Sequence, residues 1–277
     1  MLNCLRISPI LLFLVALSST AFLMTSPAAA QDQTNIFFLH NSVGSLLIDQ
    51  GEMREYLDDY NQDNGTNYVF WDHNYPYIGV RDAGGDYLNY AYSSLCGYDT
   101  NPDGVHQLWL DDTVTQYVAA RDSIMSRHDV IAFKSCYRGT DFDGARSEAE
   151  LAVALEEYKN YYLEMRDYFD EHPEKTFVVV SIPPRHRLHG EATAARAKHS
   201  RLFANWLCSS EYLGNPAREN VYAFNFMDLL AEPDDGSPTA NMLRYEYELN
   251  HSHGDSHPNQ TANSIIGPMF MQFLIDA

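Results

Sequence analysis

The sequence predicts an α/β domain in which helices cover both faces of a parallel sheet of five strands. Five short segments are rich in β-branched and aromatic residues, and helical patterns separate each of them from the next. Nearly continuous apolar strands of this kind are typical of a parallel sheet that is buried on both faces. Hydrophobic residues make up 45 % of the 277 residues, so a sizeable core is available.

The expected elements alternate along the chain, with one exception. The region 74–107 is rich in Tyr, Gly, Asp and Asn, and we expect it to form a long loop over the carboxyl edge of the sheet. The chain has no internal repeat and no low-complexity linker, so residues 31–277 are predicted to form one domain. The expected strands are residues 35–40 (NIFFLH), 67–71 (NYVFW), 129–133 (DVIAF), 176–181 (TFVVVS) and 221–226 (VYAFNF). The expected helices are residues 45–60, 108–127, 147–171, 191–212 and 260–275.

Residues 1–30 are predicted to be a signal peptide and not part of the fold. Arg6 supplies a positive start, residues 10–24 are mostly apolar, and residues 28–30 (AAA) form a small-residue cleavage signal. We therefore expect an exported protein, secreted or periplasmic. No later segment is long and apolar enough to span a bilayer, so no membrane span is expected.

The charge and the cysteines exclude two further classes of protein. The formal net charge is −20, and binding to nucleic acid normally needs a basic surface, so nucleic acid is not an expected partner. Three cysteines lie beyond the leader, Cys96, Cys136 and Cys208, so at most one disulfide can form. A small disulfide-stabilised scaffold is therefore excluded.

Polar residues follow the ends of the predicted strands, where open parallel sheets bind their ligands. Ser42 comes directly after the first strand, at the start of a helical pattern. It is either the N-cap of that helix or a nucleophile beside a helix N-terminus that favours negative charge. His257 is the candidate base, and Asp255 is the candidate acid that orients its ring. The alternative is that Asp255 or Ser256 caps the last helix.

Two short blocks resemble those of the SGNH hydrolases, also called the GDSL esterase/lipase superfamily. They are residues 37–42 (FFLHNS) and residues 255–259 (DSHPN). In that family the catalytic serine follows the first strand, and an Asp-x-x-His-Pro-like block precedes the last helix. The resemblance implies a three-layer α/β/α, flavodoxin-like fold and hydrolysis of a carboxylic ester without a cofactor. It assigns the nucleophile to Ser42, the base to His257 and the orienting acid to Asp255.

The chain departs from the family pattern in three places. The family's Gly-Asp-Ser is His40-Asn41-Ser42 here, and one residue, not two, separates Asp255 from His257. Where the family carries an oxyanion-binding Asn after the third strand, this chain reads KSCY at residues 134–137.

The oxyanion donors implied by the resemblance are therefore only partly those of the family. They are the backbone N–H of Ser42, a loop glycine, and Ser135 in place of the missing Asn. Gly79 is the first choice of glycine, with Gly84 and Gly85 as competitors. Because loss of one donor lowers the rate by about 10²–10³-fold, a non-catalytic carbohydrate-binding protein on a hydrolase fold is an alternative function.

Two groups of residues suggest what such a site binds. Arg185, His186 and Arg187 follow the fourth strand and are candidates to bind an anionic group on a substrate, or else to lie on a solvated surface. Tyr87, with Tyr90, Tyr92 and Tyr98, is a candidate to stack on sugar rings, or else to hold the loop on the core. With export, these features favour a small-molecule or polysaccharide ester, such as an O-acetylated carbohydrate.

Two other chemistries use the same region. His251, His253, Asp255 and His257 alternate along the chain and could ligate a metal ion from one side of an extended loop. The spacing matches no zinc signature, and we expect no metal. Cys136, at the end of the third predicted strand, is an alternative nucleophile for His257, or a buried and inert thiol.

Overall fold

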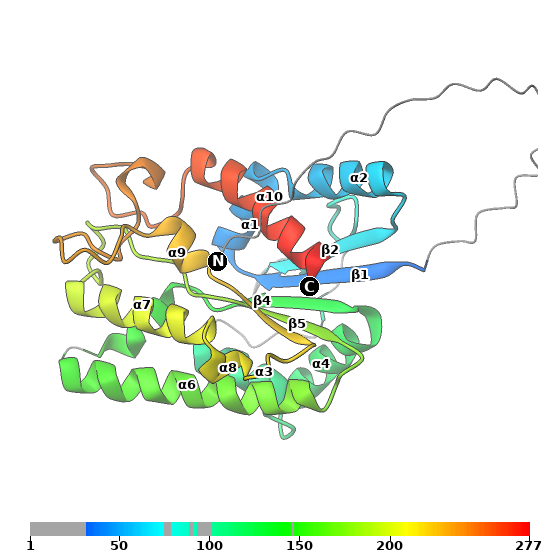
Figure 1. Cartoon of the computed structure of the whole chain (residues 1–277), viewed down its shortest axis with the longest axis horizontal. Helices are drawn as coiled ribbons and strands as arrows, with labels where there is room; N and C mark the ends of the chain where they lie inside the picture. Colours follow the sequence, from blue (N-terminus) through cyan, green and yellow to red (C-terminus); the bar gives the residue numbers. More distant parts are fainter. Residues whose placement is uncertain (1–31, 75–78, 89–90, 93–100, 146) are drawn as a thin grey trace, which may run out of the picture. The chain divides into compact units, whose positions relative to one another are not determined.

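A computed structural model describes residues 32–74, 79–88, 91–92, 101–145 and 147–277 (Figure 1). Its centre is a sheet that has six strands among these residues, in the order β3-β2-β1-β4-β5-β6. All neighbouring pairs are parallel except β2 and β3, which are antiparallel. The strands are β1 (Thr34–His40), β2 (Tyr68–Asn74), β3 (Gly79–Arg81), β4 (Val130–Lys134), β5 (Thr176–Val180) and β6 (Val221–Phe224).

The five predicted strands are confirmed, with ends that shift by a few residues. The prediction of a five-stranded, wholly parallel sheet was wrong, because β3 adds an antiparallel edge strand. This strand has three residues, too few for a periodic pattern to be seen in the sequence. The expected loop at 74–107 therefore contains a strand, and a helix begins in it at Pro102; residues 75–78, 89–90 and 93–100 lie outside the described part.

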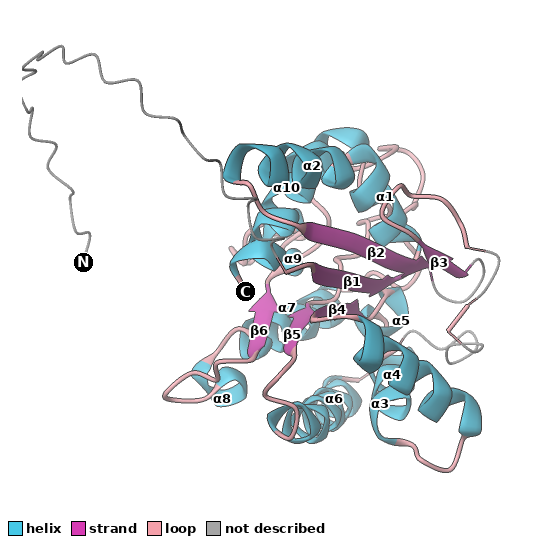
Figure 2. Cartoon of the chain, turned by 90° about the vertical axis from the view of Figure 1, so that its right-hand side faces the viewer, coloured by secondary structure: helices cyan, strands magenta, loops and turns pink. Residues whose placement is uncertain are grey.

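Helices lie on both sides of the sheet (Figure 2). One side carries α1 (Ser42–Gln50), α2 (Met53–Asn64), α9 (Phe226–Leu230) and α10 (Gln260–Asp276). The other side carries α3 (Pro102–Leu110), α4 (Thr115–Arg127), α6 (Glu148–Asp170), α7 (Ala194–Leu207) and α8 (Ser210–Leu213). Three predicted helices are each two helices in the structure, namely those at 45–60, 108–127 and 191–212. The short elements are α5 (Tyr137–Thr140), η1 (Phe142–Gly144) and η2 (Tyr245–Tyr247).

The strand β1 shows why two cores form. Successive side chains of a strand point to opposite faces, so Ile36 and Phe38 pack under α1 and α10, while Phe37 and Leu39 pack in the core beneath α3 and α6. All four side chains are buried. This segment is therefore apolar at successive positions because helices cover both faces of the strand.

The two helices beside the candidate site, α1 and α10, begin at side-chain caps. Asn41 caps α1, and its side-chain oxygen accepts the N–H of Ser42. Asn259 caps α10, and its side-chain oxygen accepts the N–H of Ala262. The cap of α1 is therefore Asn41 and not Ser42, and the cap of α10 is neither Asp255 nor Ser256.

The predicted leader lies outside the described residues, so the signal peptide and the export that it implies stay predictions. Within the described part of the chain, no helix combines the length and the apolar character needed to cross a membrane.

Candidate active site

Three side chains from the two ends of the chain meet at the carboxyl edge of the sheet. The Oγ of Ser42 lies 2.8 Å from Nε2 of His257, and Nδ1 of His257 lies 2.7 Å from Oδ1 of Asp255. Because a carboxylate only accepts, Nδ1 donates to Asp255, and Nε2 is then free to accept the hydroxyl hydrogen of Ser42. Ser42 is exposed, so the arrangement is open to a substrate.

The short spacing between Asp255 and His257 is accommodated by a local turn. The backbone N–H of His257 donates to Oδ1 of Asp255 over 3.0 Å, and the same oxygen accepts from the ring. Partial burial would raise the pKa of the Asp255 carboxyl, but these two hydrogen bonds, with the charges of His257 and His253, hold that pKa below its ordinary value. Asp255 is therefore ionised when it faces the imidazole.

Ser256, between the two, points away from them and anchors the turn. It is buried, and its Oγ accepts the backbone N–H of His186 over 3.0 Å. Its carbonyl accepts the hydroxyl of Tyr137. Side chains alternate between the two sides of an extended segment, so those of Asp255 and His257 face the candidate site and that of Ser256 faces the protein interior.

Tyr137 is a site residue that the sequence reasoning missed. Its ring meets the His257 ring edge-on, with the centroids 6.0 Å apart and the planes at 85°. Burial raises the pKa of the Tyr137 hydroxyl well above its usual value, aided by Cys136 and Asp255, so the hydroxyl keeps its proton and donates to Ser256. Its place three residues after the end of β4, at the edge where such sheets bind ligands, was the signal that could have identified it.

The implied oxyanion donors are not gathered as the resemblance suggests. The N–H of Ser42 donates to Oδ1 of Asn41 over 2.8 Å. Ser135 is fully buried, and its hydroxyl bonds the hydroxyl of Tyr162 over 3.0 Å, so this side chain lies in the core and is not a donor at the exposed Ser42. Because successive side chains of an extended segment point to opposite faces of the sheet, the face on which Ser135 lies follows from its position in the segment.

Gly79 lies closer to this edge than its two competitors. It starts β3 opposite Asn74, whose side-chain amide donates to Oγ of Ser45 in α1 over 2.9 Å. Its φ of 92° is one that glycine adopts without strain. Gly84 and Gly85 lie beyond β3, and Gly85 approaches the side chain of Arg54.

The basic segment after β5 is not a free anion site. Nε of Arg185 lies 2.8 Å from Oδ1 of Asp141, and its guanidinium lies over the Tyr137 ring. His186 is fully buried, and Arg187 is paired with Glu248. The geometry therefore does not favour Arg185, His186 and Arg187 as substrate ligands, because each of them has an internal partner.

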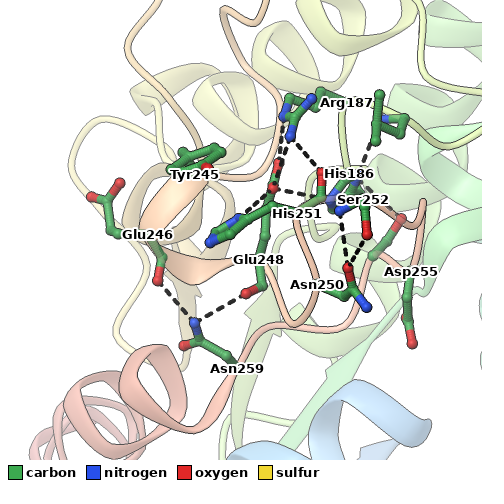
Figure 3. Close-up of polar contacts among 12 residues, drawn as sticks. His186, Arg187, Tyr245, Glu246, Glu248, Asn250, His251, Ser252, Asp255 and Asn259 are labelled. Carbon is green, nitrogen blue, oxygen red and sulfur yellow. Dashed lines mark hydrogen bonds and ion pairs between the residues drawn. The ribbon is translucent and has the colours of Figure 1, made fainter.

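Glu248 is the centre of this internal pairing, and no sequence pattern indicated it. Figure 3 shows His186, Arg187 and His251 turned toward its carboxylate. The distances are 3.1 Å from Nε2 of His186, 2.9 Å from Nε of Arg187 and 2.9 Å from Nδ1 of His251. The Glu248 side chain has no exposed surface. A charge removed from water in this way needs such partners, because desolvation of an unpaired carboxylate is costly.

The Glu248 cluster holds the loop that carries the candidate base. Glu248 forms an isolated antiparallel bridge with Pro258, and the side-chain amide of Asn259 donates to the carbonyls of Glu246 and Glu248 (Figure 3). The chain before His257 is therefore tied to the Glu248 carboxylate through His251, and the chain after it is tied to the backbone of Glu246 and Glu248.

The tyrosines of the long loop fall into different environments. Tyr87 is 43 % exposed and lies beneath the guanidinium of Arg81, so a surface for stacking remains there. Tyr92 is buried, and its hydroxyl lies 2.8 Å from Nε2 of His128, so its interpretation as a sugar-stacking residue was wrong. Tyr90 and Tyr98 lie outside the described residues.

The two other chemistries are not favoured by the geometry. His251 is bound to Glu248, whereas His257 is bound to Asp255 and Ser42. Among the residues that the structure describes, no three His, Cys, Asp or Glu side chains are grouped so that they could hold a metal ion. Cys136 is 5 % exposed and packs in the core under α1, whereas the ring of His257 faces Ser42.

Comparisons with known proteins give no family assignment. No family model matches the chain, and no curated protein matches it.

Proposed function

We propose that the protein is a serine esterase of the SGNH hydrolase type that hydrolyses a carboxylic ester, with O-acetyl groups on a carbohydrate as the substrate class. The observation that carries the proposal is the continuous chain of hydrogen bonds from Ser42 through His257 to Asp255. A hydroxyl, an imidazole and a carboxylate in this order form a hydrolytic triad, which is recognised by geometry and not by sequence order.

The topology supports the same proposal. The five parallel strands, taken without β3, have the order 2-1-3-4-5 when they are numbered among themselves. This is the order of flavodoxin-like sheets, in which ligands bind at the carboxyl ends of the strands beside the first strand. Ser42 follows the first strand, and His257 precedes the last helix, as the resemblance to the SGNH family implies.

The proposed reaction has two steps. In the first, Oγ of Ser42 attacks the ester carbonyl carbon and gives its proton to Nε2 of His257. The tetrahedral intermediate collapses, the bond to the alcohol oxygen breaks, and His257 gives its proton to the leaving alcohol. In the second, a water molecule gives a proton to His257 and attacks the acyl-serine, and the acid is released as Ser42 takes its proton back.

Asp255 and the backbone have supporting roles in this reaction. Asp255 fixes the ring of His257 in the required tautomer and stabilises the imidazolium. The N–H of Ser42 and a backbone donor near Gly79 receive the oxyanion, at the positive end of α1. No cofactor is required by these steps. The open position of Ser42 and the exposed Tyr87 support a hydrophilic substrate.

The test is the release of acetate from a panel of acetylated polysaccharides and small acetyl esters. We expect the protein to release acetate, and Ser42→Ala to reduce the rate by at least about 10³-fold. The matched control is Ser252→Ala, an exposed serine of the loop before His257 whose hydroxyl bonds only its neighbour Asn250 among the described residues. Equal rates for the protein and Ser42→Ala reject the triad, and no release by the protein leaves the non-catalytic carbohydrate-binding function.

A further inference from the structure

A buried group of charges lies directly beneath the start of α1. His40 is 1 % exposed, and its Nε2 lies 2.8 Å from Oδ2 of Asp72, which has no exposed surface. Asp72 also accepts Nη2 of Arg54 over 2.6 Å and Nε of Arg81 over 2.9 Å. Arg81 in turn lies 2.8 Å from Asp49. The buried Asp72 carboxylate therefore binds two guanidinium groups and one histidine, and the partly exposed Asp49 pairs with Arg81.

Both ring nitrogens of His40 face oxygen atoms that accept hydrogen bonds. Nε2 faces the Asp72 carboxylate, and Nδ1 lies 2.9 Å from the backbone carbonyl of Asn41. A neutral imidazole has one N–H, so its other ring nitrogen would place a lone pair against a lone pair of the facing oxygen. A carboxylic acid at Asp72 does not resolve the conflict, since this group already accepts from Arg54 and Arg81. Only an imidazolium satisfies both contacts.

The environment of Asp72 agrees with a charged His40. Burial would raise the pKa of the Asp72 carboxyl, but the hydrogen bond and charge of His40, with Arg81 and Arg54, hold that pKa well below its usual range. Burial, together with the charge of His40, lowers the pKa of the neighbouring His73 to about 4. His73, the other histidine beside Asp72, is thus neutral at pH 7.

The carbonyl that His40 contacts belongs to the peptide that carries the candidate oxyanion donor. The C=O of Asn41 and the N–H of Ser42 are the two ends of one peptide group. This carbonyl also accepts the N–H of Gly44 over 2.7 Å and that of Ser45 over 3.2 Å. Donors on a peptide oxygen polarise the peptide and make its N–H a stronger donor, and a charged donor does so most.

Gly44 allows His40 to lie this close to the first turn of α1. A Cβ on Gly44 would lie 2.3 Å from Cβ of His40 and 2.5 Å from Cγ, far inside contact distance. The ring is therefore packed directly against the turn that follows Ser42.

We propose that His40 is a positioning residue of the esterase site: as a buried imidazolium it polarises the Asn41–Ser42 peptide and strengthens the Ser42 N–H as an oxyanion donor. This inference rests on the proposed function. It gives a physical reason for a histidine where the resemblance implies a glycine, in a site whose Ser135 hydroxyl lies in the core. In the free protein the Ser42 N–H is held by Oδ1 of Asn41, and the developing oxyanion, with its greater charge, competes for it.

The first test reads the charge of His40 without reference to activity. The protein labelled with ¹⁵N in its histidines is studied by NMR at pH 7, and the His40 ring is identified by its contacts to Phe38, whose ring centroid lies 5.0 Å away. We expect two protonated ring nitrogens. A neutral tautomer of His40 overturns the proposal, whatever the protein hydrolyses.

The second test links this charge to the reaction. In His40→Gln, a neutral variant, we expect kcat to fall by about 10–100-fold with KM within about twofold, less than the roughly 10²–10³-fold effect of removing a donor outright. The control is His106→Gln on α3, where the ring bonds Glu164. An unchanged kcat in His40→Gln, with activity lost in Ser42→Ala, overturns the role of His40 and keeps the esterase. Full activity in Ser42→Ala rejects the esterase itself, and the NMR result then still decides the charge of His40.

Discussion

Oγ of Ser42 and Nε2 of His257 lie 2.8 Å apart, although 215 positions separate them in the chain. The two residues meet because the parallel sheet brings the end of β1 to the same edge as the loop before α10. A pair joined by a hydrogen bond and backed by Asp255 is able to transfer a proton, and the first prediction concerns that backing carboxylate.

Asp255→Asn should lower kcat by about 10²–10⁴-fold with a small change in KM, because an amide neither stabilises the imidazolium nor fixes its tautomer. Steady-state kinetics with an acetyl ester measure both constants. The matched control is Asp58→Asn, an exposed carboxylate on α2. Equal kcat in Asp255→Asn and the unmodified protein would show that His257 works without this carboxylate.

Glu248→Gln should lower the free energy of unfolding by about 1–3 kcal/mol, because the amide weakens the contacts that the buried carboxylate makes with His186, Arg187 and His251. Urea unfolding measures this change. Glu246→Gln is the control, since Glu246 is exposed and lies in the same turn. We also expect Glu248→Gln to be a slower esterase at a temperature where it is folded, because the loop around His257 is less firmly held. Unfolding midpoints that match in the two variants would contradict the structural role of Glu248.

The unfolding free energy should fall as the pH is lowered from 7.5 to 5.0, in part through His73. Burial, with the charge of His40, lowers the pKa of this ring to about 4, from an ordinary value of 6.5. Between these values the unfolded chain binds a proton that the folded protein does not, so unfolding is favoured as the pH falls below 6.5. The contribution over this range is roughly 2 kcal/mol.

Urea unfolding at the two pH values checks this prediction in the protein and in His73→Leu, which cannot titrate. The variant should show a shallower dependence on pH, whereas the exposed His253→Gln should keep the original slope. Identical slopes in all three proteins would mean that His73 is protonated equally in the folded and unfolded states.

Cys136→Ala should leave esterase activity unchanged, because this thiol is 5 % exposed and the ring of His257 faces Ser42. Cys208→Ala is the matched control, since it removes the other free thiol among the described residues. Kinetic assay of both variants checks the prediction. Loss of activity in Cys136→Ala alone would favour the cysteine as nucleophile.

Local pattern was sufficient to predict the five parallel strands and the approximate position of the candidate site. The strand 35–40 was visible in the sequence, because a strand covered on both faces has to be apolar along its whole length. The edge strand β3 was not, because three residues carry no period and its place depends on pairing with β2. The sequence also did not predict that Arg185 pairs with Asp141 or that the Ser135 hydroxyl bonds Tyr162 in the core. A position after a strand does not reveal the partner of a side chain.

The sequence by itself determined the five parallel strands that alternate with helical regions and identified the two blocks that contain Ser42 and His257. Only the tertiary structure decided which charges are internal: Arg185 pairs with Asp141, His186 and Arg187 pair with Glu248, and His40 pairs with Asp72. Apolar burial depends on the composition of a segment, so it can be seen locally. A buried charge needs one specific partner at hydrogen-bond distance, and that partner is supplied by packing between segments that are remote in the sequence.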